Sequence, residues 1–131
     1  MEQSNGRILC VDDDRDTCEM LEILLGDSGY KVESAMTVAD ALKLAQNSSF
    51  DLYLLDWYLP DGSGIELCQS IREFDTSTPI LFCTGAAYEA DIKRAMKAGA
   101  QGYLVKPTGA EDLIRTVHAC LPSADARSRV N

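Results

Sequence analysis

Five short apolar runs alternate along this chain with stretches whose apolar residues recur at helical spacing, and this alternation restricts the fold more than any other feature. Strands and helices that follow one another in this way form parallel sheets, in which right-handed crossovers return the chain to its starting edge. The pattern predicts an α/β fold: a doubly wound (βα)5 unit with a parallel five-stranded sheet and helices on both faces. The predicted strands are Ile8–Val11, Tyr30–Ala35, Leu52–Leu55, Ile80–Cys83 and Tyr103–Val105.

A stretch of helical spacing follows each predicted strand. Residues that favour helix starts precede three of these stretches, namely Asp14, Thr37 and Thr108. The run Tyr30–Ala35 alternates with charged residues, which indicates an edge strand, because strands buried on both faces are continuously apolar. The apolar sets are Met20/Leu21/Leu24/Leu25, Val38/Ala41/Leu42/Ala45, Ile65/Cys68/Ile71, Ile92/Ala95/Met96 and Leu113/Ile114/Val117/Leu121.

Composition narrows the class of protein. The chain has 131 residues, the length of one domain, and its 46% hydrophobic and 25% charged residues are typical of a folded globular protein. A net charge of −9 argues against unspecific binding to nucleic acids and against adsorption to anionic membranes. No apolar stretch is long enough for a membrane span or a signal peptide. The five cysteines are odd in number and lack metal-binding spacing, so we expect reduced, structural thiols and a cytoplasmic location.

Polar residues suited to metal and phosphate chemistry follow four of the predicted strands. The first strand runs into Asp12 and Asp13, the third into Asp56, the fourth into Thr84 and the fifth into Lys106. Taken singly, each residue has an ordinary explanation as a turn, strand or solvated residue. The carboxyl ends of parallel strands meet at one rim of the sheet, however, so the sequence predicts that these side chains share one site.

Charge indicates what this rim binds. Neighbouring carboxylates repel one another unless a cation or a proton neutralises them. The three negative charges of Asp12, Asp13 and Asp56 exceed the single positive charge of Lys106, so a net negative charge remains for a divalent ion to balance. A few carboxylates completed by waters and phosphate oxygens are the ligands that Mg²⁺ prefers. A Thr hydroxyl and a Lys ammonium beside the ion can hold phosphoryl oxygens, and an Asp can accept a phosphoryl group.

The segment after Asp56 carries a turn signal. Pro60-Asp61-Gly62 joins a residue that fixes φ to one that admits positive φ. The loop is therefore expected to be stiff, and a backbone carbonyl from it is a candidate to complete the metal shell.

Together these residues resemble the receiver domain of bacterial response regulators, over about residues 7–121. The resemblance implies the chemotaxis-regulator-like fold with the flavodoxin-like strand order 2-1-3-4-5. It also implies one domain over residues 1–121, with residues 122–131 as a polar C-terminal tail or the start of a linker. The matching segments are Ile8 to Asp14, Asp51 to Gly64, Pro79 to Thr84, Ala98-Gly99-Ala100 and Tyr103 to Pro107.

The resemblance implies a role for each acidic residue. Asp56 accepts the phosphoryl group. Mg²⁺ is bound by Asp13, Asp56 and the backbone carbonyl of Tyr58, while Asp12 acts mainly through water.

Other roles follow from the same resemblance. Thr84 and Lys106 bind phosphoryl oxygens, and the Lys106–Pro107 peptide is cis. Thr84 and Tyr103 form the switch: Thr84 shifts toward the phosphoryl group, Tyr103 rotates inward, and the face of the fourth helix, fifth strand and fifth helix changes shape. Thr108 departs from the family pattern, which often has Phe after Lys-Pro, and an apolar anchor is thereby lost.

The implied function is a phosphorylation-dependent signalling switch of a two-component phosphorelay. A sensor histidine kinase or a phosphotransfer protein donates the phosphoryl group, and a downstream protein partner responds. Such a domain catalyses only its own phosphorylation and dephosphorylation and is not otherwise an enzyme. We expect no direct nucleic-acid binding, because residues 122–131 are too few for a helix-turn-helix. The resemblance leaves open whether phosphorylation causes the domain to dimerise.

Two alternatives compete with this interpretation. An aspartyl-phosphate hydrolase typically needs a second Asp two residues after its nucleophile as general acid, but Tyr58 stands there. A receiver-like interaction module that is never phosphorylated is disfavoured by the complete set of acidic residues, Thr84 and Lys106.

Overall fold

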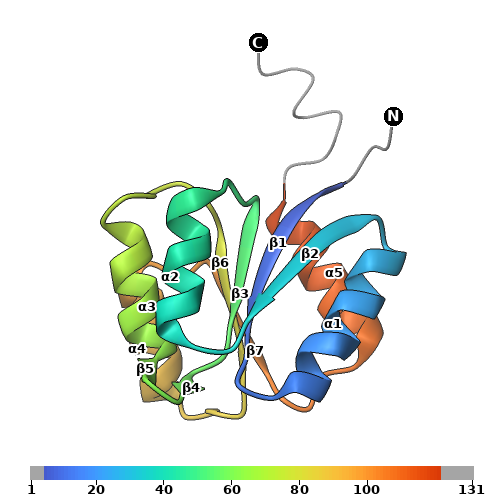
Figure 1. The fold of residues 1–131 in the computed structure, drawn as a ribbon. Coiled ribbons are helices and arrows are strands. Elements are labelled where there is room, and N and C mark those ends of the chain that lie inside the picture. The colour runs from blue at the N-terminus through green and yellow to red at the C-terminus, as the bar shows by residue number, and fades with distance from the viewer. Residues whose placement is uncertain (1–4, 122–131) are drawn as a thin grey trace.

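Five parallel strands form a central sheet in the order β2-β1-β3-β6-β7 in the computed structural model, which describes residues 5–121 (Figure 1). This order is the predicted 2-1-3-4-5, with β6 and β7 as the fourth and fifth strands of the sheet. The elements are β1 (Gly6–Val11), α1 (Arg15–Asp27), β2 (Tyr30–Ala35), α2 (Val38–Asn47), β3 (Leu52–Leu55), β4 (Tyr58–Leu59), β5 (Gly62–Ser63), α3 (Gly64–Arg72), β6 (Ile80–Thr84), α4 (Glu89–Ala98), β7 (Gly102–Val105) and α5 (Ala110–Cys120).

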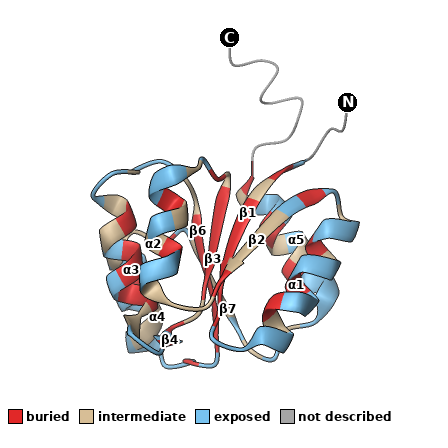
Figure 2. Ribbon diagram, viewed as in Figure 1, coloured by how far each residue is buried: buried red, intermediate tan, exposed pale blue. Residues whose placement is uncertain are grey.

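Helices cover both faces of the sheet, α1 and α5 on one and α2, α3 and α4 on the other (Figure 1). Alternate side chains of β1 serve the two faces: Leu9 and Val11 pack with α2 and α3, whereas Ile8 and Cys10 pack with α1 and α5. The central strands are buried along their length, and the outer sides of the helices are exposed (Figure 2). A doubly covered sheet explains why its strands are continuously apolar.

The edge position of β2 is confirmed. It pairs only with β1 among the described strands, in parallel register from Gly6 opposite Tyr30 to Val11 opposite Ala35. Its exposed Lys31, and Glu33 paired with Arg7, keep polar groups on a strand that has one open side.

A short antiparallel hairpin, β4–β5, follows β3 and was not predicted as strands. Tyr58 pairs with Ser63 and Leu59 with Gly62, so Pro60 and Asp61 form the turn that the sequence indicates. Gly62 does not adopt the positive φ that glycine permits: among the described glycines, positive φ occurs at Gly6, Gly29 and Gly99.

Of the three residues predicted at helix starts, Asp14 and Thr37 occupy N-cap positions and Thr108 does not. Thr37 caps α2 by accepting a hydrogen bond from the backbone N–H of Asp40 at 3.1 Å, as expected. Asp14 occupies the N-cap position of α1, but its carboxylate accepts from the Thr17 hydroxyl at 2.7 Å. Thr108 was wrong as a cap, because α5 begins at Ala110 with Gly109 at its N-cap.

The cysteines of the predicted strands are buried, as expected for structural thiols. Cys10 and Cys83 are buried, and all five cysteines are unpaired. Burial raises the pKa of Cys83 to about 11, which is typical of an inert thiol. No helix within residues 5–121 has the length and apolarity needed to cross a membrane. The predicted polar tail, residues 122–131, lies outside the described residues.

Candidate metal and phosphoryl site

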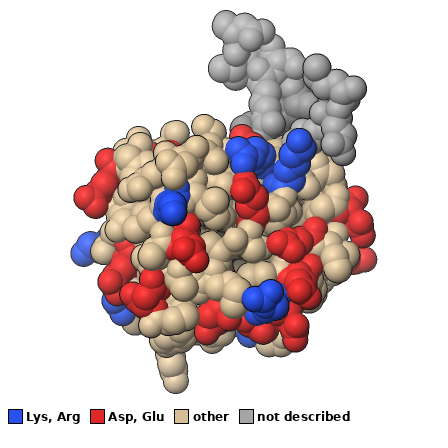
Figure 3. Space-filling view, viewed as in Figure 1, with Lys and Arg blue, Asp and Glu red and all other residues tan. Residues whose placement is uncertain are grey.

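Three carboxylates converge at the carboxyl ends of β1 and β3. One oxygen from each of Asp12, Asp13 and Asp56 lies within 4.8 Å of the other two. Asp12 is buried, Asp56 is partly buried and Asp13 is exposed, so the group opens to solvent on one side. On the face in Figure 3, further acidic side chains gather over the lower part of the view, where the strands end and α1 begins.

The sheet ladder itself holds these residues in place. The N–H of Asp12 donates to the carbonyl of Ala35 at 3.1 Å, and that of Asp56 donates to the carbonyl of Val11 at 2.9 Å. The N–H of Lys106 likewise donates to the carbonyl of Thr84 at 2.8 Å. Because the hydrogen bonding continues one residue past the strands, the side chains start from rigid backbone.

Lys106 supplies the positive charge of the site. Its Nζ lies 2.6 Å from Asp12 Oδ2 and 3.7 Å from Asp56 Oδ2. Burial acts to lower the pKa of Lys106, but the hydrogen bond that Lys106 donates to Asp12 and the charges of Asp12 and Asp56 outweigh it, so the pKa lies above its usual value. Lys106 is therefore charged at neutral pH and reaches two of the three carboxylates.

Burial raises the pKa of Asp56 above its ordinary value, and the charge of Asp12 adds to this effect. A hydrogen bond with Thr84, the charge of Lys106 and the N–H of Trp57 act in the opposite direction. The Trp57 N–H donates to Asp56 Oδ1 at 2.7 Å. Because the charged form of Asp56 is disfavoured when no cation is bound, a bound cation would stabilise the carboxylate.

The arrangement fits a magnesium ion. Its donors are carboxylate oxygens, their net charge is negative after Lys106 is counted, and the exposed side of Asp13 leaves room for water ligands. Tyr58 follows two residues after Asp56 in β4 with its side chain 68% exposed, and the role of its carbonyl as a ligand remains a prediction.

Thr84 and Tyr103 lie on neighbouring strands beside the acidic group. Thr84 is fully buried, and its hydroxyl oxygen accepts from the N–H of Ala86 at 3.4 Å. The Tyr103 hydroxyl donates to the carbonyl of Ala86 at 2.6 Å, so both side chains contact the same loop after β6. The Tyr103 ring stacks on Phe82 and is partly buried against the core. The Lys106–Pro107 peptide is cis.

Residues 8–118 match the family model described as the response regulator receiver domain. The chain belongs to this family. Receiver domains are parts of two-component response regulators, which are signalling proteins, and the family assignment agrees with the strand order and with the acidic rim.

Relatives of this receiver domain are regulatory proteins. The chain is 42% identical over 115 residues to YrkP of Bacillus subtilis, described as an uncharacterized transcriptional regulatory protein, covering 88% of this chain and 49% of YrkP. It is 33% identical over 132 residues to the transcriptional regulatory protein ResD of the same species, covering 100% of this chain and 55% of ResD. The receiver domain thus spans about half the length of these curated relatives.

Solved receiver structures have the same fold. A CheY-like receiver domain from Methanospirillum hungatei superposes with a TM-score of 0.85 at 33% identity, covering 88% of this chain and 93% of the other. The chemotaxis protein CheY4 of Vibrio cholerae gives a TM-score of 0.85 at 33% identity, covering 88% and 98%.

Several residues that support the site in this receiver domain were not predicted. A Cβ on Gly64 would lie 2.2 Å from the carbonyl oxygen of Asp56, so only glycine fits where α3 starts against Asp56. Ser63 caps α3 through the N–H of Glu66 at 3.2 Å, and its Ser-x-x-Glu spacing was a readable signal. The Cys18 thiol donates to the carbonyl of Asp12 at 3.4 Å, a contact that no local sequence pattern predicts.

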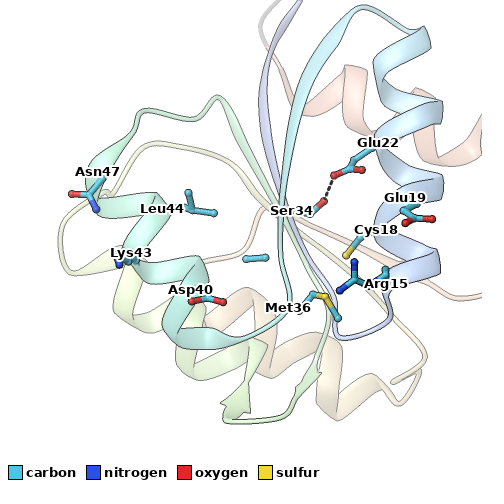
Figure 4. Close-up of a pocket in the computed structure, with 11 residues that line it drawn as sticks. Arg15, Cys18, Glu19, Glu22, Ser34, Met36, Asp40, Lys43, Leu44 and Asn47 are labelled. Carbon is cyan, nitrogen blue, oxygen red and sulfur yellow. Dashed lines mark hydrogen bonds between the residues drawn. The ribbon is translucent and has the colours of Figure 1, made fainter.

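A hollow of about 590 Å³ lies between α1 and α2 beside the end of β2 (Figure 4). Glu22 and Ser34, joined by a hydrogen bond of 2.9 Å, face it together with Arg15 and Lys43. Its lining includes none of the predicted site residues.

Proposed function

We propose that this receiver domain is a phosphorylation-dependent switch in which Asp56 accepts a phosphoryl group from a phosphohistidine. The donor is a sensor histidine kinase or a phosphotransfer protein. The observation that carries the proposal is the convergence of Asp12, Asp13 and Asp56 within 4.8 Å beside the Lys106 ammonium. Family membership supports the same role.

The chain's own groups divide the chemistry among them. An oxygen of Asp56 attacks the phosphorus, and the histidine nitrogen leaves with the electron pair of the broken P–N bond. Lys106 holds a phosphoryl oxygen and the Thr84 hydroxyl donates to another, which stabilises the charge that spreads over these oxygens in transfer. Asp13, Asp56 and the Tyr58 carbonyl would hold Mg²⁺, with Asp12 acting mainly through water, and the bound ion would supply positive charge that balances the carboxylates and the phosphoryl oxygens.

The donor approaches beside α1. A hollow of about 550 Å³ adjoins Lys106 and Pro107, with apolar walls from Leu24 and Leu113. Met20, which also lines this hollow, is 49% exposed. An apolar surface next to the acceptor rim supports docking of a protein rather than entry of a small phosphomonoester.

The switch acts through Thr84 and Tyr103. Both contact the loop at Ala86, so movement of Thr84 toward the phosphoryl group is passed to Tyr103 and to the face of α4, β7 and α5. That face receives the downstream protein partner and is the candidate surface for a phosphorylation-dependent dimer. In line with the relatives' length, any nucleic-acid contact belongs to another part of the regulator.

Trp57 provides the test. It is the only tryptophan of the chain, and its N–H donates to Asp56. With Mg²⁺, acetyl phosphate or beryllofluoride should change its fluorescence, and Asp56→Asn should abolish the change. A wild-type protein that gives no response at millimolar Mg²⁺ would leave the non-phosphorylated interaction module as the better account.

A further inference from the structure

The turn of the β4–β5 hairpin is fastened to α2 by one carboxylate. Asp61 Oδ1 accepts from the N–H of Val38 at 2.7 Å, and Asp61 Oδ2 accepts from the N–H of Ala39 at 3.0 Å. The two partners lie 23 and 22 residues earlier in the chain. The contact is therefore a tertiary cap, in which a residue of one loop satisfies the first turn of a helix from elsewhere.

The cap satisfies two backbone N–H groups at the α2 start. The first four N–H groups of a helix have no partner within it. Thr37 serves one of them, since its hydroxyl oxygen accepts from the N–H of Asp40. Asp61 serves two more, those of Val38 and Ala39, and these backbone N–H groups hold the pKa of its carboxyl below the usual value. The bond is thus formed by a charged carboxylate at a helix N-terminus, where negative charge is favoured.

The hairpin also packs closely on α2. A Cβ on Gly62 would lie 3.2 Å from Val38 Cγ2, so little space separates the two elements. At its other end the hairpin is closed by the N–H of Gly64, which donates to the carbonyl of Trp57 at 2.7 Å. Residues 58–63 are therefore held at their base beside the acceptor and at their tip by Asp61.

This hairpin carries Tyr58, the residue whose carbonyl is expected to bind the metal ion. Magnesium requires nearly ideal octahedral geometry with short ligand distances. A ligand on a short hairpin that swings about its base cannot meet this requirement without a loss of affinity.

We propose that Asp61 is a positioning residue of the metal site: by binding the first turn of α2, it fixes the hairpin that carries Tyr58 and so sets the affinity for Mg²⁺. The inference rests on the proposed function, because it concerns the same ion. It assigns α2 a part in the site although no α2 side chain is among its predicted ligands.

Three variants separate positioning from helix stability. Asp61→Ala removes both hydrogen bonds to α2. Asp61→Asn keeps one acceptor oxygen and removes the charge. Thr37→Ala is the matched control, because it removes a cap from the same helix end and leaves the hairpin tied.

Mg²⁺ dissociation constants are measured from Trp57 fluorescence and, independently, from the rise in Tm with added MgCl2. Each cap variant should lower Tm by a few degrees. Asp61→Ala should weaken Mg²⁺ binding about 5-fold, which corresponds to about 1 kcal/mol. Asp61→Asn should weaken it about 2-fold, and Thr37→Ala should weaken it less than Asp61→Asn does.

Equal Mg²⁺ affinity in Asp61→Ala and Thr37→Ala would overturn the inference and leave Asp61 as a helix cap. An Asp61→Ala protein too unstable to titrate shifts the decision to Asp61→Asn against Thr37→Ala, read the same way. A wild-type protein that binds no Mg²⁺ would instead contradict the proposed function itself, so the two failures are distinguishable.

Discussion

Lys106 Nζ lies 2.6 Å from Asp12 Oδ2, and this pair links the ends of β1 and β7, two strands that β3 and β6 separate in the sheet. Asp12 comes from β1 and Lys106 from the end of β7, an edge strand. The Asp12 side chain is only 5% exposed, whereas the Lys106 side chain is 31% exposed. The lysine thus neutralises a buried charge from the solvent side and competes with a divalent cation for it.

Replacing Lys106 with Met should therefore have opposite effects on stability and on metal binding. Without Mg²⁺, the free energy of unfolding should fall by about 2 kcal/mol, because the buried Asp12 carboxylate loses its partner. Mg²⁺ affinity should rise several-fold, while the response to acetyl phosphate should be lost. Urea unfolding in EDTA and in MgCl2 measures both effects.

The control for this variant is Lys93→Met, which removes an exposed pair with Glu89 and should change neither quantity by more than about 0.5 kcal/mol. Weaker Mg²⁺ binding by Lys106→Met would show that the lysine assists the cation and does not compete with it.

The raised pKa of Asp56 makes a prediction about pH. An Asp whose folded pKa lies above its unfolded value of 3.8 stabilises the protein when protonated, and this contribution is lost as pH rises from about 3.8 through the folded pKa. At neutral pH without metal, the charged Asp56 is therefore a cost. Asp56→Asn should raise Tm by roughly 2–5 °C in EDTA at pH 7.

The same comparison at lower pH supplies the check. The difference in Tm between Asp56→Asn and wild type should shrink as pH falls toward 4, and added MgCl2 should raise Tm of the wild type more than that of the variant. A wild type that is the more stable protein at pH 7 in EDTA would contradict the assigned direction of the pKa shift.

Gly64 is predicted to tolerate no side chain. A Cβ there would approach the Asp56 carbonyl oxygen to 2.2 Å and Phe82 to 2.9 Å, so Gly64→Ala must displace either the acceptor strand or α3. We expect a loss of about 2–3 kcal/mol in the free energy of unfolding. Gly26, in helix α1, is the opposite case, because an added Cβ has no neighbouring atom within 4 Å. Gly26→Ala should therefore raise the free energy of unfolding by about 0.5 kcal/mol. Equal effects of the two substitutions in chemical denaturation would refute the close contact.

The fold could be predicted from the sequence because its signals are local and mutually consistent. The run Leu52–Leu55 is β3 without a change of boundary, and the charged alternation in Tyr30–Ala35 marks the edge strand. The rim could be predicted for a topological reason, since parallel strands bring Asp12 and Asp56 to the same edge whatever their side chains do.

What the sequence did not predict depends on contacts between distant segments. Asp61 resembles an ordinary turn residue, and its partners Val38 and Ala39 have no sequence relation to it. Thr108 is a residue type that favours helix N-caps, but α5 begins two residues after it, at Ala110, and Gly109 occupies the N-cap position. Local propensity identifies candidates for these roles, and packing decides among them.

The most direct test of Asp56 as the phosphoryl acceptor is the intact mass of the protein after incubation with acetyl phosphate and MgCl2. We expect the wild type to gain one phosphoryl group, EDTA to prevent the gain, and Asp56→Asn to gain none. Addition of a phosphoryl group to Asp56→Asn, or its failure to appear on a folded, Mg²⁺-binding wild type with this donor and with a purified phosphohistidine donor, would contradict the assignment of Asp56 as the acceptor.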